Sequence, residues 1–122
     1  MKVVQKCLIK KGNKFLFIKR SEKARSFPGY WDLPGGNWEL NENFEAALAR
    51  EVWEETNLKV KNPKVFNVLA KPDWMMVGYF AKQASGEFKL SKEHLDFVWL
   101  AKKEAKKLKI QPPVKKLLAK IL

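Results

Sequence analysis

The stretch that most constrains this chain runs from Gly35 to Val60 and reads GGNWELNENFEAALAREVWEETNLKV. No proline or glycine interrupts residues 44–56, and several of them are strong helix formers, so the segment predicts a helix there. Asn43 is a suitable N-cap because its side-chain oxygen can accept hydrogen bonds from the free amides of the first turn. At 100° per residue, the side expected to face the core carries Leu48, Ala49, Val52 and Thr56.

The same helix carries three glutamates, Glu51, Glu54 and Glu55, whose spacing brings the carboxylates onto an adjacent face. These like charges repel one another, and a divalent cation such as Mg²⁺ or Mn²⁺ would relieve the repulsion because carboxylates are its preferred ligands. Arg50 lies beside Glu51 and four residues before Glu54, where it can orient a carboxylate. The pattern therefore indicates either a metal site or the solvated surface that is common on acidic helices.

The spacing resembles the Nudix box, the signature of the Nudix hydrolase family. The matching positions are Gly36, Glu42, Arg50, Glu51, Val52, Glu54, Glu55 and Leu58. The tract from Trp31 to Gly36, WDLPGG, is also similar to the Trp-x-x-Pro-Gly-Gly that commonly leads into the box. Asn57 departs from the family, which usually has glycine there. Asparagine is the next most tolerant residue for a left-handed helix end, so we expect the fold to be kept.

Composition indicates a single domain over residues 1–122, since a chain of this length can bury one core but not two. No run approaches the roughly 18 apolar residues of a membrane-spanning helix, and the lysine-containing N-terminus does not read as a signal peptide. The single cysteine, Cys7, is expected to be a buried thiol in a reducing compartment. We therefore expect a cytoplasmic protein without membrane contact.

Several further segments, some mixing apolar and polar residues and others largely apolar, predict strands at 3–10, 15–18, 64–70, 74–82, 87–90 and 97–100. Residues 83–86 are expected to turn the chain between the strands at 74–82 and 87–90. Further helices are expected at 102–108 and after Pro112-Pro113. This order fits an α/β (α+β) fold with a mixed sheet and a helix on each face. It is also the three-layer α/β/α sandwich that the Nudix resemblance implies.

The resemblance implies Mg²⁺-dependent hydrolysis of a diphosphate linkage in a nucleoside diphosphate derivative, with Mn²⁺ as a substitute. Such a reaction requires that phosphate charge is neutralised, a water positioned and its proton removed. We expect the metal to be held by Glu51, Glu54, Glu55 and the backbone of Gly36, with Arg50 orienting a glutamate. Glu42 is expected to support the loop or an outer metal.

Two residues are candidates for the general base. Glu51 lies on the box helix, and Glu93 precedes the strand at 97–100, where it resembles the loop glutamate used by some Nudix enzymes. An ordinary surface position for Glu93 is equally compatible with the sequence. His94, the one histidine, is expected to contact the loop or the substrate rather than act as the base.

The substrate is less constrained than the reaction. Four aromatic residues could stack on a base, although each also suits core or rim packing: Phe27, Tyr30, Trp31 and Trp74. The chain begins almost directly at its first expected strand, without the extension through which many ADP-ribose pyrophosphatases dimerise. This favours a MutT-like nucleoside triphosphate pyrophosphohydrolase that converts NTP or oxidised dNTP to NMP and pyrophosphate. ADP-ribose, diadenosine polyphosphates and capped RNA remain alternatives, as do a monomer and a homodimer.

A net charge of +12 is the most unusual global property. Lysines concentrate in the last third of the chain, at Lys102, Lys103, Lys106, Lys107, Lys109, Lys115, Lys116 and Lys120. Such a field attracts nucleotides or RNA, although lysine-rich composition often serves solubility alone. An alternative of another class is therefore a weakly catalytic Nudix domain that senses nucleotides or associates with RNA. The intact acidic cluster argues against a sensor.

Overall fold

The computed structural model describes residues 1–82 and 84–122, and within them a seven-stranded mixed sheet forms the centre of the molecule. The strand order is β3–β2–β1–β7–β6, with β4 paired to β1 and β9 paired to β2. β1 and β7 run parallel, and the other pairings between these strands are antiparallel. The bounds are β1 (Lys2–Lys11), β2 (Lys14–Arg20), β3 (Trp31–Asp32), β4 (Gly35–Asn37), β6 (Lys64–Lys71), β7 (Trp74–Ala81) and β9 (His94–Ala101).

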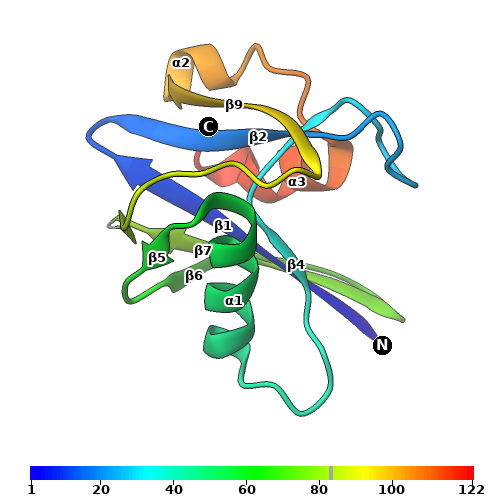
Figure 1. Ribbon diagram of the computed structural model, residues 1–122. Coiled ribbons are helices and arrows are strands. Elements are labelled where there is room, and N and C mark those ends of the chain that lie inside the picture. The colour runs from blue at the N-terminus through cyan, green and yellow to red at the C-terminus, as the bar shows by residue number, and fades with distance from the viewer. Residues whose placement is uncertain (83) are drawn as a thin grey trace.

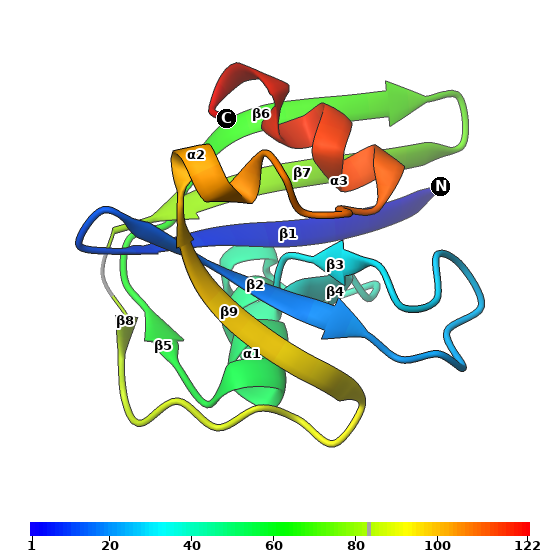
Figure 2. The same ribbon diagram turned by 90° about the horizontal axis from the view of Figure 1, so that it is seen from above.

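Helices cover both faces of this sheet, as Figures 1 and 2 show. One face carries α1 (Phe44–Thr56), and the other carries α2 (Lys102–Ala105), α3 (Pro112–Leu117) and a 3₁₀ turn (Leu118–Lys120). Successive residues of a strand point to opposite faces, so Cys7 and Ile9 join the core under α1 while Leu8 joins the core under α3. The predicted mixed sheet with a helix on each face is confirmed.

The predicted bounds of α1 match the structure. Asn43 caps it, with Oδ1 accepting hydrogen bonds from the amides of Glu45 (2.9 Å) and Ala46 (3.1 Å). At the other end Asn57 is left-handed (φ 62°), and its backbone amide donates to the carbonyl of Trp53. Its side-chain Nδ2 also donates to the carbonyl of Glu87 at 2.7 Å. The departure from glycine at position 57 therefore keeps the helix end and adds a contact.

The predicted core side of α1 was wrong at one position. Ala49 is exposed, and Ala47 is buried beside Leu48 and Val52. Ala47 belongs to the same row of the helix as Glu51, four residues on, and that row faces the sheet. The helix is therefore rotated so that Glu51 faces the sheet. The pattern of apolar residues alone does not predict this orientation.

The predicted hairpin between residues 74–82 and 87–90 is wrong. β7 already has β1 and β6 on its two sides, so no further strand can pair with it. Instead β8 (Ala84–Ser85) pairs with β5 (Lys59–Val60) in a separate two-stranded sheet. Residues 87–90 form no strand, and the amides of Lys89 and Ser91 donate to the carbonyls of Thr56 and Glu55 at the end of α1. Gln83, placed by the prediction in the turn, lies outside the described residues.

Smaller differences concern strand and helix ends. β9 begins at His94 rather than at residue 97, because it pairs with β2 along most of its length. α2 ends at Ala105, before the expected residue 108, and the short strands β3, β4, β5 and β8 were not predicted. Across residues 1–82 and 84–122, the structure has no helix long and apolar enough to cross a membrane.

Candidate metal and phosphate site

The three glutamates of α1 do not share one environment. Glu51 and Glu55 lie in the row that faces the sheet, and their side chains are 19% and 16% exposed. Glu54 lies in the neighbouring row with Arg50, and its side chain is 52% exposed. The sequence predicted a single acidic face, whereas the structure turns two carboxylates inward and one outward.

Two glycines bring the backbone of β4 against the inward carboxylates. A Cβ atom on Gly35 would lie 1.9 Å from the carbonyl oxygen of Gln5, and one on Gly36 would lie 2.4 Å from Oε2 of Glu51. The amide of Gly35 donates to Oε1 of Glu55 at 2.7 Å. Gly35 is therefore required, because a side chain there would meet the backbone of β1, whereas a side chain at Gly36 would displace the carboxylate of Glu51.

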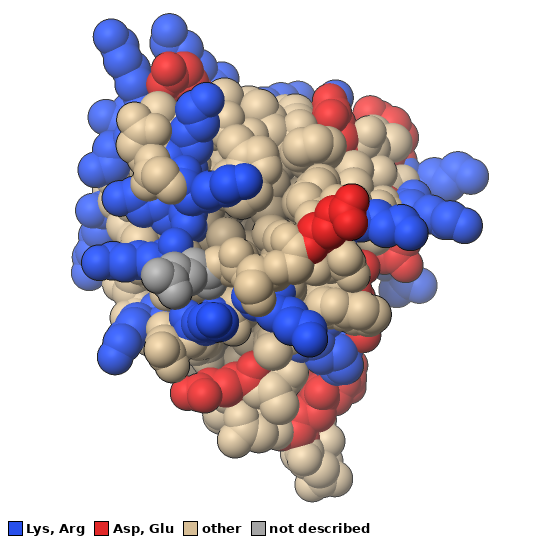
Figure 3. Space-filling view, turned by 60° about the vertical axis from the view of Figure 1, so that its left-hand side comes forward, with Lys and Arg blue, Asp and Glu red and all other residues tan. Residues whose placement is uncertain are grey.

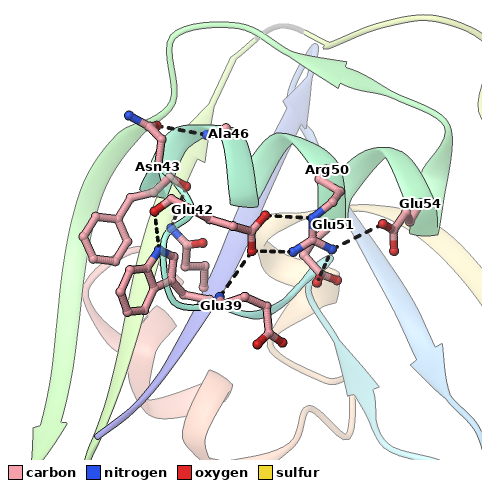
Figure 4. Close-up of polar contacts among 10 residues, drawn as sticks. Glu39, Glu42, Asn43, Ala46, Arg50, Glu51 and Glu54 are labelled. Carbon is pink, nitrogen blue, oxygen red and sulfur yellow. Dashed lines mark hydrogen bonds and ion pairs between the residues drawn. The ribbon is translucent and has the colours of Figure 1, made fainter.

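Arg50 links the loop before α1 to its glutamates (Figure 4). Its Nε and Nη2 donate to the two carboxylate oxygens of Glu42 at 3.0 and 2.8 Å. Its Nη1 donates to Oε1 of Glu51 at 2.9 Å and to Oε1 of Glu54 at 3.3 Å. These hydrogen bonds lower the pKa of Glu42 and raise that of Arg50. In this structure Glu42 thus joins the loop to Arg50.

Glu55 is buried, and burial disfavours the charged form of its carboxyl group. Burial raises the pKa of its carboxyl to about 8, although nearby Lys6 and the hydrogen bond from Gly35 act in the opposite direction. Nε2 of His94 lies 3.7 Å from Oε2 of Glu55, and burial lowers the pKa of that imidazole. Nδ1 of His94 is 2.9 Å from the hydroxyl of Ser91. His94 is therefore positioned between Glu55 and Ser91.

A cleft of about 570 Å³ opens beside Glu55, between the β4 backbone and the first residues of β1. The rings of Phe27 and Trp74 line it. Four cationic residues also line it: Lys2, Lys6, Arg20 and Lys71. The cleft thus presents Glu55 on one wall and, elsewhere, cationic side chains together with Asp32. This combination can accommodate a cation and phosphate groups side by side.

Asp32 organises the cationic part of this cleft. It is 2% exposed, and its Oδ2 accepts hydrogen bonds from Nζ of Lys6 (3.0 Å), Nη1 of Arg20 (2.8 Å) and Nε2 of Gln111 (2.7 Å). Its Oδ1 accepts from the amide of Leu33 at 2.7 Å. The sequence reasoning missed this cluster because its members are far apart in the chain. Lys6, a lysine in the middle of the strand predicted at 3–10, was the available signal.

The predicted aromatic residues separate into two groups. Phe27 and Trp74 line the cleft. Tyr30 and Trp31 are not among its lining residues: Tyr30 packs edge-on against Phe27 and under Lys109, and Trp31 packs against the core beneath α3.

Glu93 is exposed and borders a neighbouring hollow together with Arg20, Glu55 and His94. The structure thus places Glu93 near the acidic end of the cleft.

Fold and site together define an α/β/α sandwich in which a carboxylate-bearing helix faces a cationic cleft. The NUDIX domain profile matches residues 3–121, and the chain belongs to the Nudix hydrolase family.

Relatives with different names match the chain. It is 35% identical over 96 residues to the NAD-capped RNA hydrolase NudC of Mannheimia succiniciproducens, covering 75% of this chain and 36% of the relative. It is 44% identical over 66 residues to the ADP-ribose pyrophosphatase of Methanocaldococcus jannaschii, covering 54% of this chain and 38% of the relative. The chain therefore spans little more than a third of the length of these two relatives.

Solved structures confirm the fold. The MutT Nudix hydrolase of Burkholderia pseudomallei superposes with a TM-score of 0.74 at 29% identity, over 82% of each chain. The E. coli ORF135 protein gives a TM-score of 0.84 at 23% identity, over 97% of this chain and 86% of the other.

Nudix hydrolases generally use divalent metal ions. Among the described residues, no three acidic, histidine or cysteine side chains form a ready metal-binding group. The donors nevertheless fit a hard cation, because Glu51 and Glu55 are two largely buried carboxylates packed against the glycine backbone of β4. The pKa of Glu55 is raised because its carboxylate is buried and nearby groups balance its charge only in part.

Proposed function

We propose that this chain hydrolyses a diphosphate linkage in a nucleoside diphosphate derivative, with Mg²⁺ as the metal. The observation that carries the proposal is the cleft in which buried Glu55 faces Lys6 and Arg20. A phosphoanhydride repels an attacking hydroxide, so its hydrolysis requires both charge neutralisation and a group that accepts a proton.

The metal would be held by Glu51, Glu55 and the backbone of Gly36, with Glu54 at the exposed edge. When bound, a divalent cation would neutralise charge on the phosphate oxygens. Arg50 holds Glu51 in one orientation, and its bidentate contact with Glu42 fixes the guanidinium in turn. Mn²⁺ has similar ligand preferences and would substitute.

Lys6 and Arg20 would bind the phosphate chain of the substrate. Both are held by Asp32, so their positions are set before the substrate arrives. Phe27 and Trp74 border the same cleft and would contact the base or sugar. A volume of about 570 Å³ lies within the range of pockets that enclose small ligands.

A nucleoside triphosphate is our first candidate substrate, with NMP and pyrophosphate as products. Its support is the similarity to MutT proteins and a cleft with four cationic residues for a polyphosphate chain. ADP-ribose, dinucleoside polyphosphates and NAD-capped RNA are the competing substrates, and relatives bearing two of those names match this chain.

The deciding experiment is Mg²⁺-dependent turnover on a panel of these substrates, together with oxidised dNTPs, with products identified by mass. We expect one class to be cleaved with far higher kcat/KM than the others. Glu55→Gln and Glu51→Gln should each lower turnover by about 10²–10⁴-fold. Glu39→Gln, which changes an exposed carboxylate on the preceding loop, is the matched control and should retain activity. Absence of turnover on every substrate, with Mg²⁺ binding intact, would contradict the proposal.

The base is tested separately. Glu51→Gln and Glu93→Gln are compared at saturating Mg²⁺ in single-turnover experiments across pH. A proton acceptor accounts for about 10²–10⁴-fold in rate, so a Glu93→Gln rate within a few-fold of wild type would exclude Glu93 as the base.

A further inference from the structure

Five lysines meet at the end of the sheet opposite the cleft. β1 and β7 are parallel, so Lys10 and Lys11 at the end of β1 lie beside Lys82, which follows β7. β6 is antiparallel to β7 and begins there with Lys64, and Lys61 follows the short β5. We call these residues the five-lysine surface: Lys10, Lys11, Lys61, Lys64 and Lys82. Figure 3 shows Lys and Arg side chains gathered over this end of the molecule.

The surface is hollowed rather than flat. A hollow of about 380 Å³ is lined by Lys10, Lys11, Lys61 and Lys82 together with the rings of Phe88 and Trp99. A neighbouring hollow of about 420 Å³ is lined by Lys61, Asn62, Lys64, Phe80 and Lys82. The two hollows share Lys61 and Lys82, so they lie side by side on this surface, and no described lining residue is acidic.

These lysines are not neutralised by the protein. Within residues 1–82 and 84–122, the ion pairs involve Lys6, Arg20, Arg50 and His94 and none of the five lysines. Four of the five are exposed, and Lys10 is half-buried. Like charges held together by strand ends raise the local positive potential, which favours a ligand with regularly spaced negative charge.

We propose that the five-lysine surface binds single-stranded nucleic acid. Cationic side chains beside aromatic rings suit a phosphodiester backbone and its unstacked bases. A single phosphate would require one hollow, whereas two adjacent hollows accommodate successive nucleotides. The inference goes beyond the proposed hydrolysis, because the surface lies at the far end of β1 from the cleft. Along β1 the cleft reaches Lys6, and the four residues from there to Lys10 span about 13 Å at about 3.3 Å each.

The test is fluorescence anisotropy of a labelled single-stranded 12-mer RNA, without divalent metal, between 50 and 300 mM KCl. Lys61→Gln/Lys82→Gln should weaken binding at least tenfold at 50 mM and reduce the slope of log Kd against log[salt] by about 1.4. Lys115→Gln/Lys116→Gln removes the same charge from exposed positions on α3 and should change Kd less than twofold. Lys2→Gln/Lys71→Gln removes the same charge at the cleft and is the second control.

Each other outcome has a defined meaning. Equal weakening by all three pairs, or no binding of the wild type at 50 mM, would overturn the proposal. Loss of binding only in the Lys2/Lys71 pair would place the RNA in the cleft and also overturn it. Competition by inorganic tripolyphosphate as strong as that of RNA, at equal phosphate concentration, would rule out a nucleic-acid site. Nucleotide hydrolysis by Lys61→Gln/Lys82→Gln should remain at the wild-type rate, which separates this result from failure of the proposed function.

Discussion

Glu55 shows how a single residue can be unfavourable for folding and still suit the site. Its carboxylate receives one hydrogen bond, from Gly35, and lies near Lys6, but these contacts do not offset its removal from water. Its folded pKa of about 8 lies above the ordinary value of 4.5. Between these values the folded state binds more protons than the unfolded state, so stability falls as pH rises.

The free energy of unfolding of the metal-free protein should therefore fall by about 1.4 kcal/mol from pH 7 to pH 9 through Glu55 alone. His94, whose pKa is lowered, stays neutral over that window and does not interfere. Glu55→Gln should remove the pH dependence and stabilise the protein at pH 9, whereas Glu54→Gln, at the exposed position, should not. Urea denaturation with EDTA at both pH values measures this, and a steep loss of stability in Glu55→Gln would contradict the electrostatic account.

At the scale of the element, α1 is specified at both ends by asparagine. Asn43 accepts hydrogen bonds from the free amides of the first turn, and Asn57 takes the left-handed conformation that ends the helix. Between these two residues, three adjacent rows of side chains on α1 make different contacts. One row packs on the core, one presents Glu51 and Glu55 to β4, and one carries Arg50 and Glu54. A small change in helix rotation would therefore alter the site before it altered the fold.

Asn57 offers a test of the helix end. Asn57→Ala should destabilise the protein by about 1–2 kcal/mol, because alanine disfavours the left-handed conformation and loses the hydrogen bond to Glu87. Asn57→Gly keeps the conformation without strain and should lie within about 1 kcal/mol of the wild type. Thermal unfolding of the pair distinguishes conformation from hydrogen bonding. Equal losses in both variants would assign the whole effect to the side-chain contact.

The Arg50–Glu42 contact connects α1 to the loop before it. Arg50→Lys keeps the charge but cannot form the bidentate contact with Glu42 while also reaching Glu51 and Glu54. We expect turnover to fall by about tenfold or more, with Tm changed by only a few degrees because the side chain is partly exposed. Steady-state kinetics with a Mg²⁺ titration checks this. Full activity in Arg50→Lys would show that only the charge matters.

At the scale of the molecule, Asp32 joins parts of the chain that are distant in sequence. It ties β3 to Lys6 of β1, Arg20 of β2 and Gln111 at the start of α3. The cationic groups of the cleft therefore depend on the assembly of β1, β2 and β3 and on the packing of α3 against them. Buried ion pairs of this kind are costly to break, because the remaining charge is left without a partner.

Asp32→Asn should lower the free energy of unfolding by about 3 kcal/mol and raise KM, since Lys6 and Arg20 lose the negative charge with which both are paired. Asp73→Asn, in the exposed turn between β6 and β7, is the matched control and should change neither quantity. Urea denaturation and steady-state kinetics measure the two effects. A stable Asp32→Asn variant with unchanged KM would show that the cluster does not position the cleft.

Local signals predicted the local structure of this chain. Capping residues and uninterrupted helix formers predicted α1, and a polar turn between apolar runs predicted the β1–β2 hairpin. The tract WDLPGGN lacks strand periodicity, so β3 and β4 were missed, because they form only through pairing with β2 and β1. Lys6, Asp32 and Gln111 were missed for the same reason. Their partnership exists only after the sheet has assembled, and no short window contains it.

The parallel pairing of β1 with β7 also has a consequence for how the chain acquires its structure during synthesis. Residues 2–9 of β1 each meet a partner 72 positions later, since Lys2 pairs with Trp74 and Ile9 with Ala81. A ribosome adding 5–20 residues per second needs roughly 4–14 s to make that interval. During this time β1 can pair with β2 and β4, but the edge that will receive β7 is open. Long-range pairing also slows folding in general. The cleft, built from both ends of this interval, is therefore among the last parts of the molecule to exist.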